Sequence, residues 1–147
     1  MDTADVSNAL AVQENRANMS ALLRRHAITP THQRIQIAQV LFERCEHLSA
    51  EQIIGYVNAR YAETSKATVY NTLKLFLGKK LIRAIIVDPE RIVYDPNITP
   101  HHHFYDVVTG SLTDIPVDAI HIGQLPPLPE GRVADGVDVI IRTRPAG

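Results

Sequence analysis

The 147-residue chain has one cysteine, no tryptophan and no long apolar run. A single thiol, Cys45, forms no disulfide within the chain and excludes zinc sites built from CxxC pairs. No stretch approaches the roughly 20 apolar residues of a membrane-spanning helix. Asp2 and Asp5 stand where a signal peptide has basic residues. These absences predict a cytoplasmic protein without cysteine-ligated structural zinc.

The composition, 45% hydrophobic and 21% charged, is typical of a globular protein with a packed core. Its charges are unevenly placed along the chain. Residues 20–87 hold ten Lys or Arg against four Asp or Glu, whereas residues 88–147 hold four against nine. The basic first half favours a polyanion as partner, and the acidic second half indicates a different task.

Apolar spacing predicts two helices in the first third of the chain. Residues 1–19 show no firm pattern and are treated as an N-terminal extension. A first helix follows up to about residue 27, where Thr29-Pro30-Thr31 interrupts it, because proline disfavours helix in the residue before it. A second helix begins at Pro30 or Thr31 and ends near Arg44 or Cys45.

Two further helices begin at recognisable caps. Ser49 and Gln52 have the spacing of a capping box, which predicts a third helix over about 50–60. Thr64-Ser65 offers an N-cap for a fourth helix, and Gly78 is suited to a left-handed helix end.

The periodicity then changes. Residues 81–88 and 91–95 are rich in Ile and Val, and the turn residues between them predict a β-hairpin. Helices followed by a hairpin predict an N-terminal winged helix-turn-helix domain over residues 1–95. Two prolines near residues 96–100 predict a hinge. We assign residues 101–147 to a small second α/β domain, so the fold class is α+β.

In that small domain, residues 102–108 and 111–115 predict a second hairpin around Thr109-Gly110. Residues 117–124 predict a short helix and residues 137–141 a final strand. A domain of about 45 residues buries little apolar surface by itself. We therefore expect the same domain of a second chain to complete it in a homodimer.

In a winged helix-turn-helix of this layout, the fourth helix enters the DNA major groove. Lys66 and Lys74 lie eight residues apart, where they can contact phosphates, and Tyr70 can lay its ring on a thymine methyl. The alternative is a solvated helix face, but the helix pair, the hairpin and the basic charge favour DNA. The predicted DNA-binding residues are Ser65, Lys66, Thr68, Tyr70, Asn71, Lys74 and Arg34.

Three consecutive histidines open the second domain. On a strand, His101 and His103 project from one face together with Tyr105, while His102 points to the other face. Two imidazoles and a phenol suit a divalent metal or ferric iron. A solvated polar loop is the alternative interpretation of the triplet.

His47, at the start of the third helix, and Asp95, at the end of the hairpin, are candidates to complete a metal site. A small hydrolase with a metal-bound water is a competing hypothesis. We expect no further Asp or Glu near the triplet to act as a base, and no enzymatic activity is predicted.

Three segments resemble the signatures of the ferric uptake regulator (Fur) superfamily, over a region of about residues 20–116. They are Thr29-Pro30-Thr31-His32-Gln33-Arg34, His47-Leu48-Ser49-Ala50-Glu51 and Ala67-Thr68-Val69-Tyr70-Asn71-Thr72-Leu73. Within the superfamily, residues 101–105 and 109–116 are most similar to the Irr branch, the iron-response regulators that sense haem.

The resemblance implies a homodimer that binds an AT-rich inverted repeat of double-stranded DNA through the helix starting near Lys66. It also implies a regulatory site between the domains for iron, manganese or zinc. By position, the metal ligands are His47, Asp95, His103 and Tyr105. A neighbouring site, implied for haem, comprises His101, His102 and His103.

The sequence departs from the family pattern in its metal ligands. Where typical members have two CxxC pairs for structural zinc, this sequence has Val107-Val108 and no cysteine beyond residue 45, and Phe104 replaces an acidic ligand. No Cys-Pro haem motif occurs, which leaves histidine as the axial ligand for haem.

The favoured hypothesis is a regulator of iron or haem genes in which metal or haem at the junction changes the angle between the DNA-binding heads. Similarity to the Irr branch implies that haem or iron weakens DNA binding. The alternative is a zinc-, manganese- or peroxide-responsive regulator of the same type.

Overall fold

A computed structural model describes the chain except for residues 1–2, 45–46, 62–63 and 100. The chain divides into two compact units, Met1–Ile98 and Thr99–Gly147. The first unit holds the helices and a small sheet, and the second holds another small sheet. The predicted α+β class, with a winged helix before a small sheet-containing unit, is confirmed.

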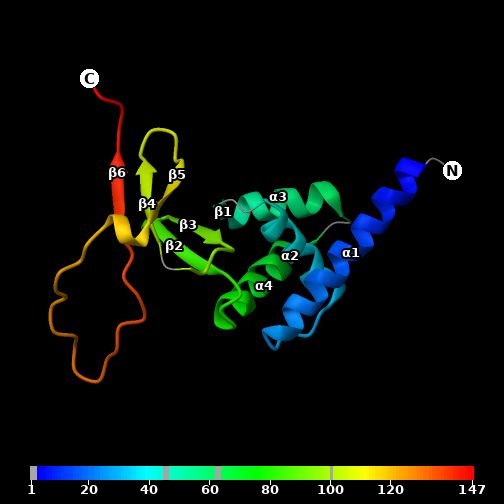
Figure 1. Ribbon diagram of the computed structural model, residues 1–147, viewed down its shortest axis with the longest axis horizontal. Coiled ribbons are helices and arrows are strands. Elements are labelled where there is room, and N and C mark those ends of the chain that lie inside the picture. Colours follow the sequence, from blue (N-terminus) through cyan, green and yellow to red (C-terminus); the bar gives the residue numbers. More distant parts are fainter. Residues whose placement is uncertain (1–2, 45–46, 62–63, 100) are drawn as a thin grey trace. The chain divides into compact units, whose positions relative to one another are not determined.

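Four helices form the body of the first unit (Figure 1). Their bounds are α1 (Thr3–Arg25), α2 (His32–Arg44), α3 (Ala50–Arg60) and α4 (Lys66–Gly78). The last three agree with the sequence prediction, although Cys45, offered as one end of α2, lies outside the described residues. Ser49 and Gln52 form the predicted capping box of α3, and Ser65 caps α4.

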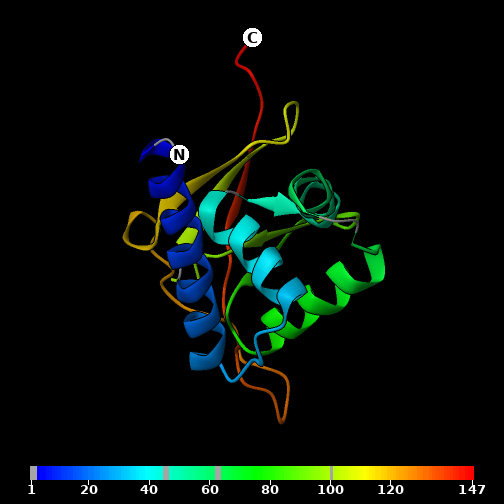
Figure 2. The ribbon, with the colours of Figure 1, turned by 90° about the vertical axis from the view of Figure 1, so that its right-hand side faces the viewer.

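Helix α1 is longer than predicted and includes most of the supposed extension. Its residues contain no glycine or proline and include many good helix formers, but its apolar residues do not follow a clear stripe. Polar contacts help to hold it on α2, beside which it lies in both views (Figures 1 and 2). The buried Gln39 amide donates to Asn15 Oδ1 at 3.3 Å and accepts from the Tyr61 hydroxyl at 2.5 Å.

Helices α1 and α4 end in the same motif. After α1, Ala27 has φ 58° and Ile28 N–H donates to the Leu23 carbonyl. After α4, Lys80 has φ 58° and Leu81 N–H donates to the Phe76 carbonyl. Both are Schellman ends with a buried apolar contact. The prediction for Gly78 is therefore wrong, because the left-handed position falls two residues later, on Lys80.

The sheet of the first unit is antiparallel, in the order β1-β3-β2. Strands β2 (Arg83–Asp88) and β3 (Arg91–Asp95) are the predicted hairpin, and β1 (Leu48–Ser49) was not predicted. Two residues are too few for a periodic pattern, and β1 is defined only by its pairing with β3. Leu48 pairs with Tyr94, which ties the start of α3 to the hairpin.

The second unit has a three-stranded sheet in the order β5-β4-β6. Strand β4 (His101–Asp106) pairs antiparallel with β5 (Leu112–Pro116) and parallel with β6 (Ile140–Thr143). The helix predicted at 117–124 is wrong, because only the single 3-10 turn η1 (Val117–Ala119) forms there. The final strand starts three residues later than predicted, after a long irregular segment that contains Pro126, Pro127 and Pro129 (Figure 1).

Among the described residues, no helix combines the length and apolarity that crossing a membrane requires.

Replacing Ala27 with glycine should stabilise the first unit. A non-glycine residue in the left-handed region costs about 1–2 kcal/mol, so Ala27→Gly should raise the free energy of unfolding by about 1 kcal/mol in urea titrations. The matched control is Ala17→Gly, at an exposed position within α1, which should lower that free energy by about as much. Destabilisation by both variants would contradict the assignment of the α1 end.

Candidate nucleic-acid interface and metal centre

Helix α4 divides into a buried face and an exposed face. Val69, Leu73 and Phe76 lie in the core of the first unit. The cap is the Ser65 hydroxyl, which accepts from the Thr68 N–H at 3.2 Å. The exposed residues are Ser65, Lys66, Tyr70, Asn71 and Lys74, with Thr68 half-buried at the margin. The structure therefore places the predicted contact residues of α4 on one side of the helix.

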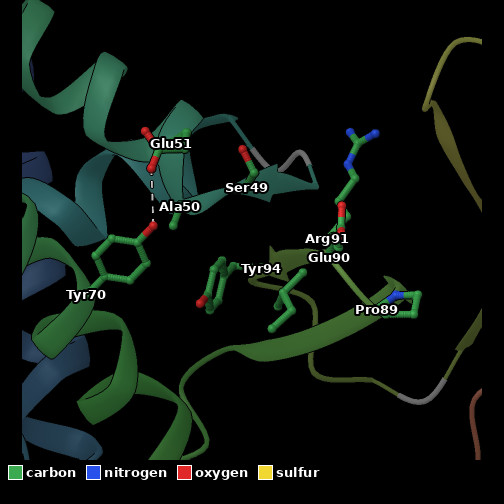
Figure 3. Close-up of a pocket in the computed structure, with 9 residues that line it drawn as sticks. Ser49, Ala50, Glu51, Tyr70, Pro89, Glu90, Arg91 and Tyr94 are labelled. Carbon is green, nitrogen blue, oxygen red and sulfur yellow. Dashed lines mark hydrogen bonds between the residues drawn. The ribbon is translucent and has the colours of Figure 1, made fainter.

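Tyr70 is held by a residue that sequence analysis did not single out. Its side chain is 45% exposed, and its hydroxyl donates to Glu51 Oε1 at 3.2 Å (Figure 3). Partial burial, followed by this hydrogen bond, raises the pKa of the Tyr70 hydroxyl above its ordinary value. Glu51 Oε2 also lies 3.9 Å from Lys66 Nζ. These contacts of Glu51 join α3 to α4. The spacing of the residues in the sequence does not predict them.

Arg34 lies at the margin of the same surface. Thr31 Oγ1 accepts from the Arg34 backbone N–H at 3.3 Å, and the guanidinium donates to the Thr29 carbonyl at 2.9 Å. A guanidinium has five N–H groups, so this bond orients Arg34 without using all its donors. Together with Thr68 and Asn71, Arg34 lines a groove between α2 and α4 of about 440 Å³. The rest of its lining is neutral and mostly polar.

In the second unit, strand β4 brings three predicted ligands to one face. His101, His103 and Tyr105 are all buried, and His103 is completely so. The pairing of β4 with β5 sets Asp114 opposite His103. Asp114 Oδ1 lies 3.5 Å from His101 Nε2 and 3.4 Å from His103 Nε2. Two imidazole nitrogens and a carboxylate oxygen that converge in this way suit a divalent transition metal.

The expectation that no acidic residue stands near the triplet is therefore wrong. A hairpin closed by a turn near Thr109-Gly110 places Asp114 on the face of His103 and Tyr105, because directly paired residues share a face. The predicted strands 102–108 and 111–115 already put Asp114 on this face, although they would pair it with Tyr105 and not with His103 as observed. Asp114 lies against the same two imidazole nitrogens, as a further ligand does, and is not set apart as a base.

Hydrogen bonds give the first two histidines different roles. The His101 Nδ1 contacts the Thr99 carbonyl at 2.6 Å, so it is the donor and Nε2 is left for a metal. The Nδ1 of His102 accepts from the Val139 N–H at 3.0 Å. In the neutral ring the proton is then on Nε2. His102 thus fastens the segment before β6 and does not join His101 and His103.

The remaining predicted ligands lie in the first unit. His47 Nε2 is 3.1 Å from Asp95 Oδ2, and the Asp95 side chain is buried at the end of β3. Pairing of Leu48 with Tyr94 brings these neighbours together. The pair is an imidazole and a carboxylate, the same donor types as in the second unit.

A basic winged helix-turn-helix followed by a small sheet that gathers imidazoles and a carboxylate defines the class of metal-responsive DNA-binding regulators. Residues 26–125 match the model of the Ferric uptake regulator family, and the chain belongs to that family.

Two relatives show how far the sequences have diverged. The ferric uptake regulation protein of Synechococcus elongatus is 29% identical over 108 residues, which span 71% of this chain and 74% of that protein. The peroxide-responsive repressor PerR of Staphylococcus epidermidis is 26% identical over 94 residues, which span 64% of this chain and 63% of that protein. The chain thus spans less than two thirds of the second relative.

Solved structures share the fold. The ferric uptake regulator from Pseudomonas aeruginosa with manganese aligns with a TM-score of 0.68 and 21% identity, over 87% of this chain and 98% of that one. The ferric uptake regulator from Francisella tularensis with iron gives 0.65 and 19%, over 80% and 91%. A zinc-bound manganese uptake regulator gives 0.63 and 22%, over 87% and 98%.

Removal of the Asp114 carboxylate should weaken metal binding. Because its oxygen lies against both imidazole nitrogens, Asp114→Ala should lower the affinity for Co²⁺ by at least about tenfold, measured by the visible absorption of the bound ion. Asp118→Ala removes an exposed carboxylate four residues away and is the control. Equal Co²⁺ affinities of the two variants would refute a role for Asp114 as a ligand.

Proposed function

We propose that the chain is a dimeric, sequence-specific DNA-binding transcription regulator whose DNA affinity depends on a bound metal ion. The exposed face of α4 is the observation that carries the DNA-binding part. It presents two lysines, a tyrosine and an asparagine on a helix whose opposite face is locked in the core. Family membership supports the regulatory role.

The side chains of the α4 face have two roles: some contact phosphates and position the helix on DNA, and others recognise bases. Lys66 and Lys74 contact phosphates on either side of the helix, and Arg34 adds a third phosphate contact. Asn71 offers an amide for a base edge, and the ring of Tyr70 covers a thymine methyl. A thymine contact in each of two half-sites favours an AT-rich inverted repeat for the dimer.

The small second unit supports dimerisation. It exposes apolar side chains that a monomer would leave in water, including Phe104, Val108 and Ile141 at 40%, 70% and 40%. Covering them with the same surface of a second copy removes this exposure. The DNA-binding heads are then present in pairs.

The metal-binding part rests on the convergence of His101, His103 and Asp114. We include His47, Asp95 and Tyr105 as ligands of the regulatory metal, on the resemblance to the family. A bound ion supplies the positive charge that holds these donors in one arrangement. If the ion binds the DNA-bound form more tightly, DNA raises metal affinity by the same factor as metal raises DNA affinity.

Iron is the proposed signal, and zinc, manganese or peroxide sensing is the alternative. An Irr-like response to haem is a second candidate for the histidine triplet. The contacts favour a small ion, because His101 and His103 are buried beside Asp114 and His102 is engaged by Val139. A macrocycle needs an accessible imidazole for its axial bond.

Loss of one phosphate-contacting lysine should change the salt dependence of DNA binding. For Lys66→Ala or Lys74→Ala, the slope of log affinity against log salt should fall in magnitude by about 1, because one fewer counterion is released. Fluorescence anisotropy on a duplex obtained by in vitro selection measures the slope. Arg132→Ala removes an exposed cation of the second unit and is the control. Unchanged slopes in both lysine variants would exclude α4 as the DNA contact.

Metal and haem should act differently on DNA binding. Mn²⁺ or anaerobic Fe²⁺ should change the affinity of the wild type in gel shifts, and the triple variant His101→Ala/His102→Ala/His103→Ala should no longer respond. Added haem should give no stoichiometric Soret shift with either protein. Stoichiometric haem binding that weakens DNA binding and is lost in the triple variant would instead establish an Irr-like sensor.

A further inference from the structure

Glu51 occupies an unusual place for a carboxylate, at the edge of a surface proposed to bind DNA. Its side chain is 67% exposed, and its two oxygens contact Tyr70 and Lys66 of α4. We propose that Glu51 determines the sequence specificity of DNA binding, by positioning the Tyr70 ring and by lowering the contribution of Lys66 to sequence-independent binding. The inference rests on the proposed function of α4.

The Tyr70 side chain has a second position available, inside a pocket beside α4. It forms one wall of an open pocket of about 250 Å³, which Figure 3 shows between α3, α4 and the hairpin. Ala50, Ile92 and Tyr94 contribute apolar surface to the same pocket. Turning the ring inward would bury apolar area, which is favourable. The hydrogen bond to Glu51 opposes this rotation and keeps the ring on the exposed face of α4.

Glu51 is itself well placed to hold Tyr70. It lies in the first turn of α3, between the two residues of the capping box. Both capping hydrogen bonds are present, so the backbone that carries Glu51 is fixed. A carboxylate near a helix N-terminus is also stabilised by the helix dipole. The hydrogen bond to Tyr70 therefore starts from an ordered support.

The negative charge of Glu51 repels DNA phosphates, whereas the positive charges of the lysines attract them. The Lys66 side chain is 71% exposed, and its Nζ lies 3.9 Å from Glu51 Oε2. Any duplex brings phosphates to this surface, and a carboxylate there repels them whatever the base sequence. Only the correct base sequence provides a thymine methyl for the ring that Glu51 holds. The Glu51 charge therefore lowers the affinity for every duplex to the same extent. The Glu51 hydrogen bond raises the affinity only for the duplex that offers a thymine methyl to the Tyr70 ring.

Two substitutions separate these effects. Glu51→Gln removes the charge but keeps an oxygen that accepts from the Tyr70 hydroxyl, whereas Glu51→Ala removes both. Tyr70→Phe removes the hydrogen bond and leaves the charge. Glu90→Ala removes another carboxylate from the same pocket, without the contact to Tyr70, and is the control.

The measurement uses the full chain loaded with Mn²⁺ and a duplex selected in vitro. Each thymine of the duplex is replaced in turn by deoxyuridine, and a scrambled duplex reports sequence-independent affinity. In the wild type, deoxyuridine at one position of each half-site should lower the affinity about fourfold, because burial of one methyl group contributes about that much. That cost should disappear in Glu51→Ala and Tyr70→Phe and persist in Glu51→Gln and Glu90→Ala.

Affinity for the scrambled duplex gives the second readout. It should rise about two- to fivefold in Glu51→Gln and Glu51→Ala at low salt, and stay unchanged in Tyr70→Phe. Thermal unfolding confirms that each variant is folded. The double variant Glu51→Ala/Tyr70→Phe should discriminate no less than either single variant, because both remove the same hydrogen bond.

The inference is overturned if folded Glu51→Ala retains the full cost of deoxyuridine. A wild type that binds the selected and scrambled duplexes equally would instead refute the proposed function itself. These two failures are distinguished in the same titrations, because the first concerns a variant and the second concerns the unmodified chain.

Discussion

The packing of α4 into the helical core is the constraint on which the exposed face of α4, proposed to bind DNA, depends. Val69, Leu73 and Phe76 are at most 1% exposed. Each such side chain contributes about 1.5–3 kcal/mol through burial, so a rotation of α4 about its axis would cost more than any surface contact returns. The direction in which Lys66 and Tyr70 face is therefore decided by residues of the hydrophobic core.

The register of β4 and β5 has the same importance for the side chains proposed to bind metal. A shift by one residue would move Asp114 to the opposite face of the sheet. The loop between the strands prevents this: the Asp106 carboxylate accepts from the Val108 N–H at 2.8 Å and the Thr109 N–H at 3.1 Å. These hydrogen bonds, that of Thr109 first, lower the pKa of Asp106. The carboxylate stays ionised at neutral pH, and the loop keeps its form.

Much of this arrangement follows from local sequence signals. Caps at Ser49 and Ser65 predicted α3 and α4, and strand alternation separated His102 from His101 and His103. Local signals failed where pairing between distant segments decides the outcome. Strand β1 and the contact between Glu51 and Tyr70 exist only through tertiary structure. At Lys80 the buried contact of Leu81 with Phe76 overrides the usual preference for glycine in a left-handed residue.

The absence of further cysteines also shapes the metal chemistry. Imidazole and carboxylate ligands bind zinc more tightly than iron or manganese when geometry is ignored. The proposed selectivity for iron therefore depends on ligand type and metal supply. Oxygen donors shift this balance, because they are harder than imidazole. Asp114 beside His103 adds one oxygen, and the proposed ligand Tyr105 adds a phenol oxygen. A ligand set with this much oxygen is better suited to iron than the histidine triplet alone.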